Sequence, residues 1–158
     1  MVLVSSEKVF AKEANQNFGL GILLGSPTAI TGKYWLDSQA AIDGGLAFSF
    51  SDYVLIYADY LFHYPRPFNQ AGEFFSELSF YLGAGGNLVV TTNERSSSDN
   101  YLGKKSGSVG LGVRVPFGLE WMPARPTLGL FVEIVPGISI VPSTSVLVQG
   151  GFGARYYF

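Results

Sequence analysis

The sequence predicts a single antiparallel, up-and-down transmembrane β-barrel of eight strands. Three features favour this fold: residues alternate between two unlike faces, charged residues are scarce, and glycine and aromatic residues are abundant. Charged residues make up 14% of the chain, aromatic residues make up 15%, and 20 residues are glycine, whereas ordinary soluble domains carry about 25% charge. No window holds the roughly 18 consecutive apolar residues of a transmembrane helix, so a helical membrane span is excluded.

Length and charge narrow the function classes further. A chain of 158 residues with a net charge of −2 is one domain by size and lacks the basic surface of a nucleic-acid-binding protein. The absence of cysteine excludes disulfide scaffolds, thiolate metal sites and cysteine nucleophiles, and we expect no metal and no cofactor. Residues 1–16 are predicted to be an N-terminal extension and residues 17–158 the barrel domain. The extension has no apolar run of signal-peptide length. Either an initiator Met replaces a native leader or the protein is not secreted, and we favour the first alternative.

The predicted strands follow one another, each with alternating apolar and small or polar residues. They cover residues 17–25, 29–36, 41–51, 53–64, 77–90, 108–121, 127–141 and 146–158. Turn or loop residues separate them at 26–28, 37–38, 51–52, 65–72, 91–105, 123–126 and 142–144. The count falls to seven if residues 17–36 form one strand kinked at Pro27, but an even, closed sheet leaves no exposed edge. Pro116 and Pro136 fall inside strands, which demands bulges or edge-like positions.

One face of these strands is bulky and apolar, and no charged residue falls on it. The opposite face is rich in glycine and carries seven charges, three positive and four negative. These charged residues are Lys33, Asp43, Asp59, Arg114, Glu120, Glu133 and Arg155. In a membrane barrel the bulky face meets lipid, and the other face lines a lumen just wide enough for side chains to fill. The charges must then pair, because an unpaired buried charge is costly.

The alternative is a soluble, lipocalin-like barrel that binds an apolar small ligand. Its bulky face would point inward, and the face that carries glycine and charge would meet water. Glycine weakens strands and packs nothing at water-exposed positions, so the many glycines favour the membrane barrel. Aromatic residues near strand ends, among them Tyr34, Tyr64 and Trp121, match the interfacial girdles of membrane barrels.

The last residues, Gly151-Phe152-Gly153-Ala154-Arg155-Tyr156-Tyr157-Phe158, and the charge set resemble the small eight-stranded outer-membrane β-barrels of Gram-negative bacteria, of the OmpA transmembrane-domain and OmpX type. The resemblance implies location in the bacterial outer membrane, contact with its lipid, and paired charges inside the barrel. It also implies that Tyr156 and Phe158 form a C-terminal signal for the barrel-assembly machinery. The chain departs from the family in its short outer loops, of which only residues 91–105 are long.

Three further hypotheses concern chemistry. Arg114, Glu120, Glu133 and Arg155 form either a gate for ions or a static network that fills the lumen, and we favour the static network. Asp43 and Asp59 are a possible acid/base couple, but ion pairing, with Lys33 as a partner, is the simpler interpretation. The single histidine, His63, is expected at an interface or in a loop.

We therefore expect a non-enzymatic monomer with a structural or surface-interaction role, or at most a very narrow ion path. A surface partner would bind through the loop at residues 91–105. An outer-membrane lipid-modifying enzyme would rest only on Asp43, Asp59 and His63, and it is the weakest of the three classes.

Overall fold

The computed structural model describes residues 17–48, 53–65, 72–91, 109–123 and 127–158. The predicted extension (1–16) and almost all of the predicted loop at 91–105 lie outside the described residues. The described elements are β1 (Phe18–Ser26), β2 (Thr28–Trp35), β3 (Ala40–Phe48), β4 (Tyr53–Pro65), α1 (Glu73–Ser76), β5 (Leu78–Thr91), β6 (Val109–Arg114), β7 (Phe117–Trp121), β8 (Leu128–Val141) and β9 (Ser145–Tyr157).

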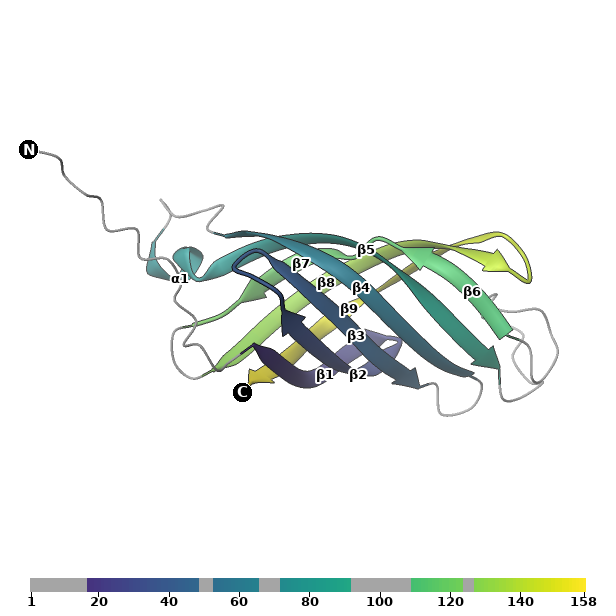
Figure 1. Ribbon diagram of the computed structural model, residues 1–158, viewed down its shortest axis with the longest axis horizontal. Helices are drawn as coiled ribbons and strands as arrows, with labels where there is room; N and C mark the ends of the chain where they lie inside the picture. Colours follow the sequence, from purple (N-terminus) through teal and green to yellow (C-terminus); the bar gives the residue numbers. More distant parts are fainter. Residues whose placement is uncertain (1–16, 49–52, 66–71, 92–108, 124–126) are drawn as a thin grey trace, which may run out of the picture.

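The strands close into a ring of eight positions (Figure 1). Strands in neighbouring positions of the ring pair antiparallel, and β1 pairs with β9 to close the sheet. β6 and β7 share one position, because both pair with β5 on one side and with β8 on the other. Pro27 does mark a reversal, since Leu23 of β1 pairs with Ala29 of β2. The predicted eight-stranded, up-and-down barrel is confirmed, and the seven-strand alternative is wrong.

The register of the sheet sets the tilt of the strands. Successive cross-strand partners of Gly19 lead around the ring through Lys33, Asp43, Asp59, Gly85, Arg114 and Gly137 to Leu147. Gly19 itself pairs with Tyr157, ten residues further along β9. A shear of ten residues over eight strands tilts the strands by about 40° from the barrel axis.

Proline interrupts the sheet where a backbone donor is missing. Val115 and Pro116 separate β6 from β7, and the Pro116 carbonyl still accepts a hydrogen bond from the Gly83 amide at 2.8 Å. Pro136 stays inside β8, where its carbonyl accepts from the Val115 amide at 2.9 Å. The sheet is thus interrupted at Pro116, whereas Pro136 keeps regular register with Val148 of β9. The register shift between β6 and β8 lies at Leu111, away from both prolines.

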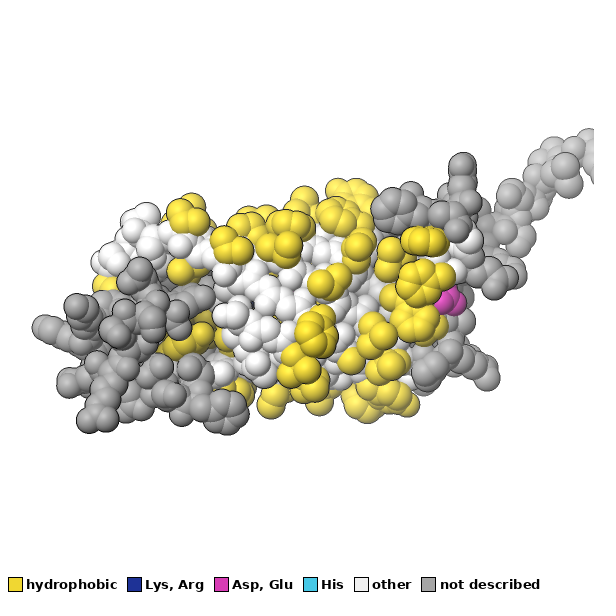
Figure 2. Space-filling model, turned by 180° about the vertical axis from the view of Figure 1, so that it is seen from behind, with side chains coloured by type: hydrophobic (Ala, Val, Ile, Leu, Met, Phe, Trp, Pro, Cys, Tyr) yellow, Lys and Arg dark blue, Asp and Glu magenta, His cyan; other side chains and the backbone are white. Residues whose placement is uncertain are grey.

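The bulky face points outward. Ile22, Ile56 and Val132 are 52%, 46% and 51% exposed, respectively, whereas their neighbours Leu23, Leu55 and Phe131 are buried. Figure 2 shows hydrophobic side chains over the barrel wall and no Lys or Arg among the described residues of that face. This arrangement is that of a transmembrane β-barrel. The soluble alternative is wrong, because it required the bulky face inside.

The two ends of the barrel are built differently. We call the end where β1 begins and β9 stops the terminal end, and the opposite end the loop end. At the terminal end the Phe158 amide donates to the Phe18 carbonyl at 2.9 Å, and α1 lies there too (Figure 1). The sequence did not predict α1. Among the described residues, no helix is long and apolar enough to cross a membrane.

The short turn between β2 and β3, also at the terminal end, is held by one carboxylate. Asp37 Oδ1 accepts hydrogen bonds from the Gln39 and Ala40 amides, both at 2.7 Å. These backbone donors favour the ionised form and so lower the pKa of Asp37 below its ordinary value. Its predicted role as a turn former is in accord with this geometry.

Inward-facing glycines make room for aromatic rings. A Cβ on Gly118 would lie 2.7 Å from the Tyr81 hydroxyl, and one on Gly153 would lie 2.4 Å from the Phe131 ring. Gly45 stands in the same relation to the Tyr57 ring, at 2.7 Å. The glycines that looked costly on a water-facing sheet are thus explained by a narrow lumen filled with large side chains.

Candidate functional site: the charged lumen

All seven charged residues predicted on the inner face lie inside the barrel. Their exposure ranges from 0% for Lys33 and Glu120 to 4% for Arg114. Each residue comes from a different strand, and each side chain points inward because it occupies an inward position in the alternation of its strand. In strand order β2, β3, β4, β6, β7, β8 and β9, they are Lys33, Asp43, Asp59, Arg114, Glu120, Glu133 and Arg155.

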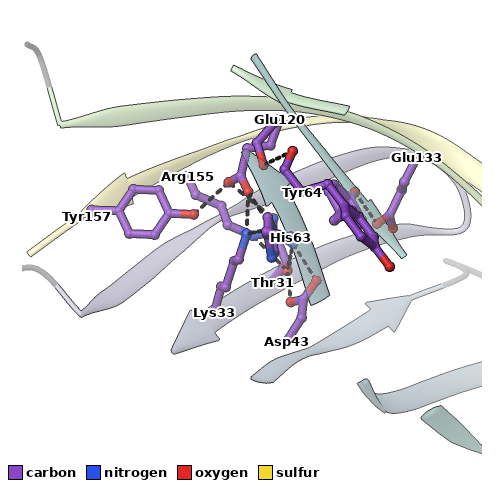
Figure 3. Close-up of polar contacts among 11 residues, drawn as sticks. Thr31, Lys33, Asp43, His63, Tyr64, Glu120, Glu133, Arg155 and Tyr157 are labelled. Atoms are coloured by element: carbon purple, nitrogen blue, oxygen red, sulfur yellow. Dashed lines mark hydrogen bonds and ion pairs between the residues drawn. The ribbon is translucent and has the colours of Figure 1, made fainter. Parts of the chain in front are cut away.

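The first cluster surrounds Glu120 (Figure 3). Its Oε2 forms an ion pair with Lys33 Nζ, and its Oε1 accepts a hydrogen bond from the Tyr157 hydroxyl at 2.6 Å. Lys33 Nζ also lies 2.8 Å from His63 Nε2 and 4.3 Å from the centre of the Trp35 ring. A lysine ammonium has three donors and no acceptor. Here the carboxylate of Glu120, the imidazole of His63 and the indole of Trp35 surround it.

The second cluster surrounds Arg155, on β9. Its Nη2 donates to Asp43 Oδ2 at 2.7 Å and to Thr31 Oγ1 at 2.8 Å, and Thr31 in turn donates to Asp43 Oδ1 at 3.0 Å. The guanidinium carbon lies 3.8 Å from the centre of the Phe131 ring. Arg155 Nη1 is 3.9 Å from Glu120 Oε1, so this cluster touches the first one.

The third cluster joins Arg114 and Asp59. Arg114 Nε lies 3.1 Å from Asp59 Oδ2, and Arg114 Nη1 donates to Gln149 Oε1 at 3.3 Å. The guanidinium also lies 4.1 Å from the centre of the Tyr57 ring. Each of the three cations therefore has a carboxylate partner and an aromatic neighbour, an arrangement that offsets part of the cost of burial.

The fourth carboxylate, Glu133, is held differently. Its Oε2 accepts a hydrogen bond from the Tyr81 hydroxyl at 2.9 Å, and among the described residues it forms no ion pair. Figure 3 shows Glu133 to one side of the residues that converge on Glu120. Among the described residues, the lumen thus contains three close pairs of a cation with a carboxylate, the longer contact of Arg155 with Glu120, and one carboxylate bound by a phenol.

An apolar cluster fills the barrel toward the loop end. On β2, β3 and β5, its members Ala29, Ala47 and Val89 lie nearer the loop end than Lys33, Asp43 and Tyr81 on the same strands. The cluster consists of Leu23, Ala29, Ala47, Tyr53, Leu55, Tyr57, Val89 and Phe131. Two rings of this cluster, Tyr57 and Phe131, lie against the guanidinium groups of Arg114 and Arg155, so the apolar cluster and the charged clusters meet inside the lumen.

The pairings differ from some of the sequence-based hypotheses. Lys33 pairs with Glu120 rather than with either aspartate. Asp43 and Asp59 are direct cross-strand neighbours, yet each carboxylate pairs with a different arginine. Among the four residues of the hypothetical gate, the contact that the structure gives is that of Arg155 with Glu120.

The interpretation of His63 as an interface or loop residue was wrong. The residue is 1% exposed and lies inside the barrel, 3.4 Å from Glu120 Oε2. The signal was present in the sequence, because alternation along a strand turns His63 to the face opposite that of its neighbours Phe62 and Tyr64. The interpretation followed the position of His63 near the end of a predicted strand and not the alternation.

Two other predicted features bear on function. Within the described residues, no group of three or more His, Cys, Asp or Glu could hold a metal ion. Tyr156 and Phe158 both point outward, with exposures of 51% and 57%, and their rings lie 5.2 Å apart. Their role as an assembly signal stays a prediction.

Three solved structures are similar to this chain. The N-terminal β-barrel domain of Pseudomonas aeruginosa OprF is similar, with a TM-score of 0.60 and 16% identity over 90% of this chain and 98% of that chain. Neisserial surface protein A (NspA) gives a TM-score of 0.47 and 16% identity over 89% and 93%. Ail, the attachment invasion locus protein of Yersinia pestis, gives 0.38 and 16% over 89% and 93%. The OprF domain supports the predicted fold of the small OmpA- and OmpX-type barrels.

Sequence comparison gives a family as well. No curated protein sequence matches the chain. A family model described as "Protein of unknown function (DUF3996)" matches residues 10–157, which is nearly the whole chain. The chain therefore belongs to the DUF3996 family.

Proposed function

We propose that this chain is an integral protein of a bacterial outer membrane whose lumen is sealed by paired charges. Its role is structural or one of surface interaction, it is not an enzyme, and it conducts ions through a very narrow path at most. The observation that carries the proposal is the inversion of an ordinary globular protein: apolar side chains cover the outside, and the charged residues of the strands are buried inside.

The contacts inside the barrel support a filled lumen rather than a pore. An eight-stranded barrel has room for its own side chains only, and here Lys33, Glu120 and Arg155 are 0–1% exposed. The apolar cluster toward the loop end, which includes Leu23, Leu55 and Val89, fills a further part of the lumen. The ion pairs of Lys33 with Glu120, Arg114 with Asp59, and Arg155 with Asp43 join six strands, and this also favours a static network over a mobile gate.

The lumen contacts also support a non-enzymatic role. Asp43 and Asp59 are each paired with an arginine, and His63 lies between Lys33 and Glu120. A general acid or base must reach the proton that it transfers in a bound substrate. The burial of all three residues inside the barrel leaves no approach for a lipid from the outer surface.

Outer-membrane lipid would be the main partner, and the barrel-assembly machinery would meet the chain during insertion through Tyr156 and Phe158. A surface partner would use the polar loop predicted at residues 91–105, between β5 and β6 in the sequence. We expect the protein to be a monomer in detergent.

Conductance in planar bilayers tests the sealed lumen. We expect the folded protein to give at most rare, small steps of ionic current in salt solution. The matched variants are Glu120→Ala, which removes the partner of Lys33, and Val132→Ala, which changes only the outer face. Large, steady steps from the unmodified protein would contradict the sealed lumen. An increase with Glu120→Ala but not with Val132→Ala would show that the ion network forms part of the seal.

A further inference from the structure

The connection between β4 and β5 places two exposed aromatic side chains at the terminal end of the barrel. Phe74 and Phe75, both in the one-turn helix α1, are 56% and 40% exposed. Their rings lie 5.5 Å apart in an edge-to-face arrangement. Adjacent large apolar side chains with this exposure mark a surface that meets a partner or a membrane.

Contacts with β7 fix the position of α1 on the barrel. The Phe74 ring lies 5.6 Å from the Trp121 ring, and Trp121 Nε1 donates to Glu77 Oε2 at 3.0 Å. The Met122 amide donates to the Glu77 carbonyl at 3.1 Å. Glu77, which follows α1 directly, therefore fastens this helix to the end of β7 through both its side chain and its backbone.

The exposed rings continue the outer surface of the neighbouring strands. On β4 and β5 the Phe62 and Tyr64 rings are 5.0 Å apart, and the Tyr64 and Phe80 rings are 6.0 Å apart. Leu78, next to α1, pairs with Trp121 across the sheet. We call this set the aromatic patch; it consists of Phe62, Tyr64, Phe74, Phe75, Phe80 and Trp121. Leu78 and Phe80 share one face of β5, and Leu78 pairs with Trp121, so the rings on the strands and those on α1 lie on the same side of the sheet.

We propose that α1 lies in the interfacial layer of the membrane leaflet at the terminal end, with Phe74 and Phe75 inserted between phospholipid molecules. Aromatic residues concentrate at this depth, and short apolar helix faces enter the layer between headgroups and acyl chains. Lipid is the occupant because the aromatic patch is continuous with a surface that already faces lipid. The inference rests on the proposed membrane-embedded barrel, and it adds an anchor outside the strands.

Depth-dependent fluorescence quenching tests the placement. The chain has only two tryptophans, so a background with Trp35→Phe and Trp121→Phe has no tryptophan emission. Phe75→Trp in this background reports on α1, and Val132→Trp reports on the middle of the wall. Each variant is reconstituted in phosphatidylcholine vesicles that carry bromine either near the glycerol or near the chain end. We expect the label near the glycerol to quench Phe75→Trp about twofold more than the label near the chain end, and the reverse for Val132→Trp.

The controls separate failure of the anchor from failure of the barrel. Trp121→Phe alone leaves Trp35, which is buried in the lumen at 8% exposure, and neither label should quench it strongly. Trp35→Phe alone leaves the native Trp121 and α1 intact, and it should repeat the shallow preference of Phe75→Trp. Unquenched Phe75→Trp beside quenched Val132→Trp would overturn the anchor and leave the barrel standing, with a protein on the patch as the alternative occupant. Quenching of neither reporter would overturn both the anchor and the proposed function.

Discussion

The inner and outer faces of the same strands follow opposite rules. On the outer face of β8, Leu130, Val132 and Ile134 are 41–51% exposed and make no polar contact, whereas Phe131, Glu133 and Val135 on its inner face are 2–4% exposed. The inner face needs particular partners, since every cation there has a specific carboxylate. The outer face needs only apolar character. A substitution on the inner face should therefore be costly because it leaves a buried charge without its partner. A substitution on the outer face should be costly when it places a polar or charged group in lipid.

The glycines separate the two faces as well. Inside, a Cβ on Gly118 would lie 2.2 Å from the Val132 carbonyl oxygen, whereas a Cβ on the outward Gly32 would come no closer than 3.6 Å to any atom. Glycine inside is thus required by packing. We have no structural account of glycine at position 32, where alanine fits.

The largest expected effect is on the inner face. Arg155→Ala leaves Asp43 without its cation inside the barrel, and we expect it to lower the free energy of unfolding by about 3–5 kcal/mol. Urea unfolding in lipid vesicles measures this loss. The double variant Arg155→Ala/Asp43→Ala should recover a large part of it, because no buried carboxylate is then stranded. An unchanged stability in Arg155→Ala would count against the charged lumen.

A charge on the outer face comes next. Val132→Arg places a guanidinium near the middle of the lipid-facing wall, and we expect a loss of about 2–4 kcal/mol. Val132→Leu is the control and should change the stability little. Complete loss of folding in Val132→Arg would instead indicate a close-packed protein core on that face.

Substituting alanine for one inward and one outward glycine should change the stability less, and in opposite directions. Gly118→Ala should cost about 1–3 kcal/mol, because its methyl group collides with Tyr81 and with the backbone of β8. Gly32→Ala should stabilise the strand by about 0.5 kcal/mol, because alanine loses less conformational entropy than glycine. Equal effects of the two substitutions would mean that the lumen is less tightly filled than the contacts show.

The smallest effect concerns a turn outside both faces. Because the pKa of Asp37 is lowered in the folded state, its ionised form stabilises the fold above the ordinary pKa of 3.8 and loses this contribution as the pH falls through the folded value. Asp37→Asn should therefore flatten the decrease in melting temperature at acidic pH. The exposed position makes the effect small, and an unchanged acid profile would show that the two turn hydrogen bonds do not depend on charge.

Much of the fold was predictable because alternation is a property of the chain itself. The strand starts at Tyr53 and Val109 lie within a residue of their predictions, and the reversal at Pro27 was correct. The faces followed from the same period, which is why the lumen charges were found by position alone. α1 was missed because one helical turn has too few residues to show a helical period.

Partners inside the lumen were not predictable from spacing. Lys33 and Glu120 lie 87 residues apart, and their pairing depends on the shear and on which side chains reach across the barrel. Asp43, on β3, lies opposite Asp59 of the adjacent strand β4. Its ion-pair partner Arg155 comes instead from β9, which β2 and β1 separate from β3 in the sheet. The alternation gives the face of each residue, and only the closed geometry gives its contacts.

If the bulky face meets lipid and the charged face is enclosed, alternate residues of β8 must differ in their access to oxygen dissolved in the membrane. Since the chain has no cysteine, single cysteines at positions 130 to 135 of β8 can carry nitroxide spin labels in reconstituted vesicles, with oxygen accessibility as the readout. We expect high accessibility at Leu130→Cys, Val132→Cys and Ile134→Cys, and low accessibility at Phe131→Cys, Glu133→Cys and Val135→Cys. A reversed pattern, or the same accessibility at all six positions, would contradict this assignment of the two faces.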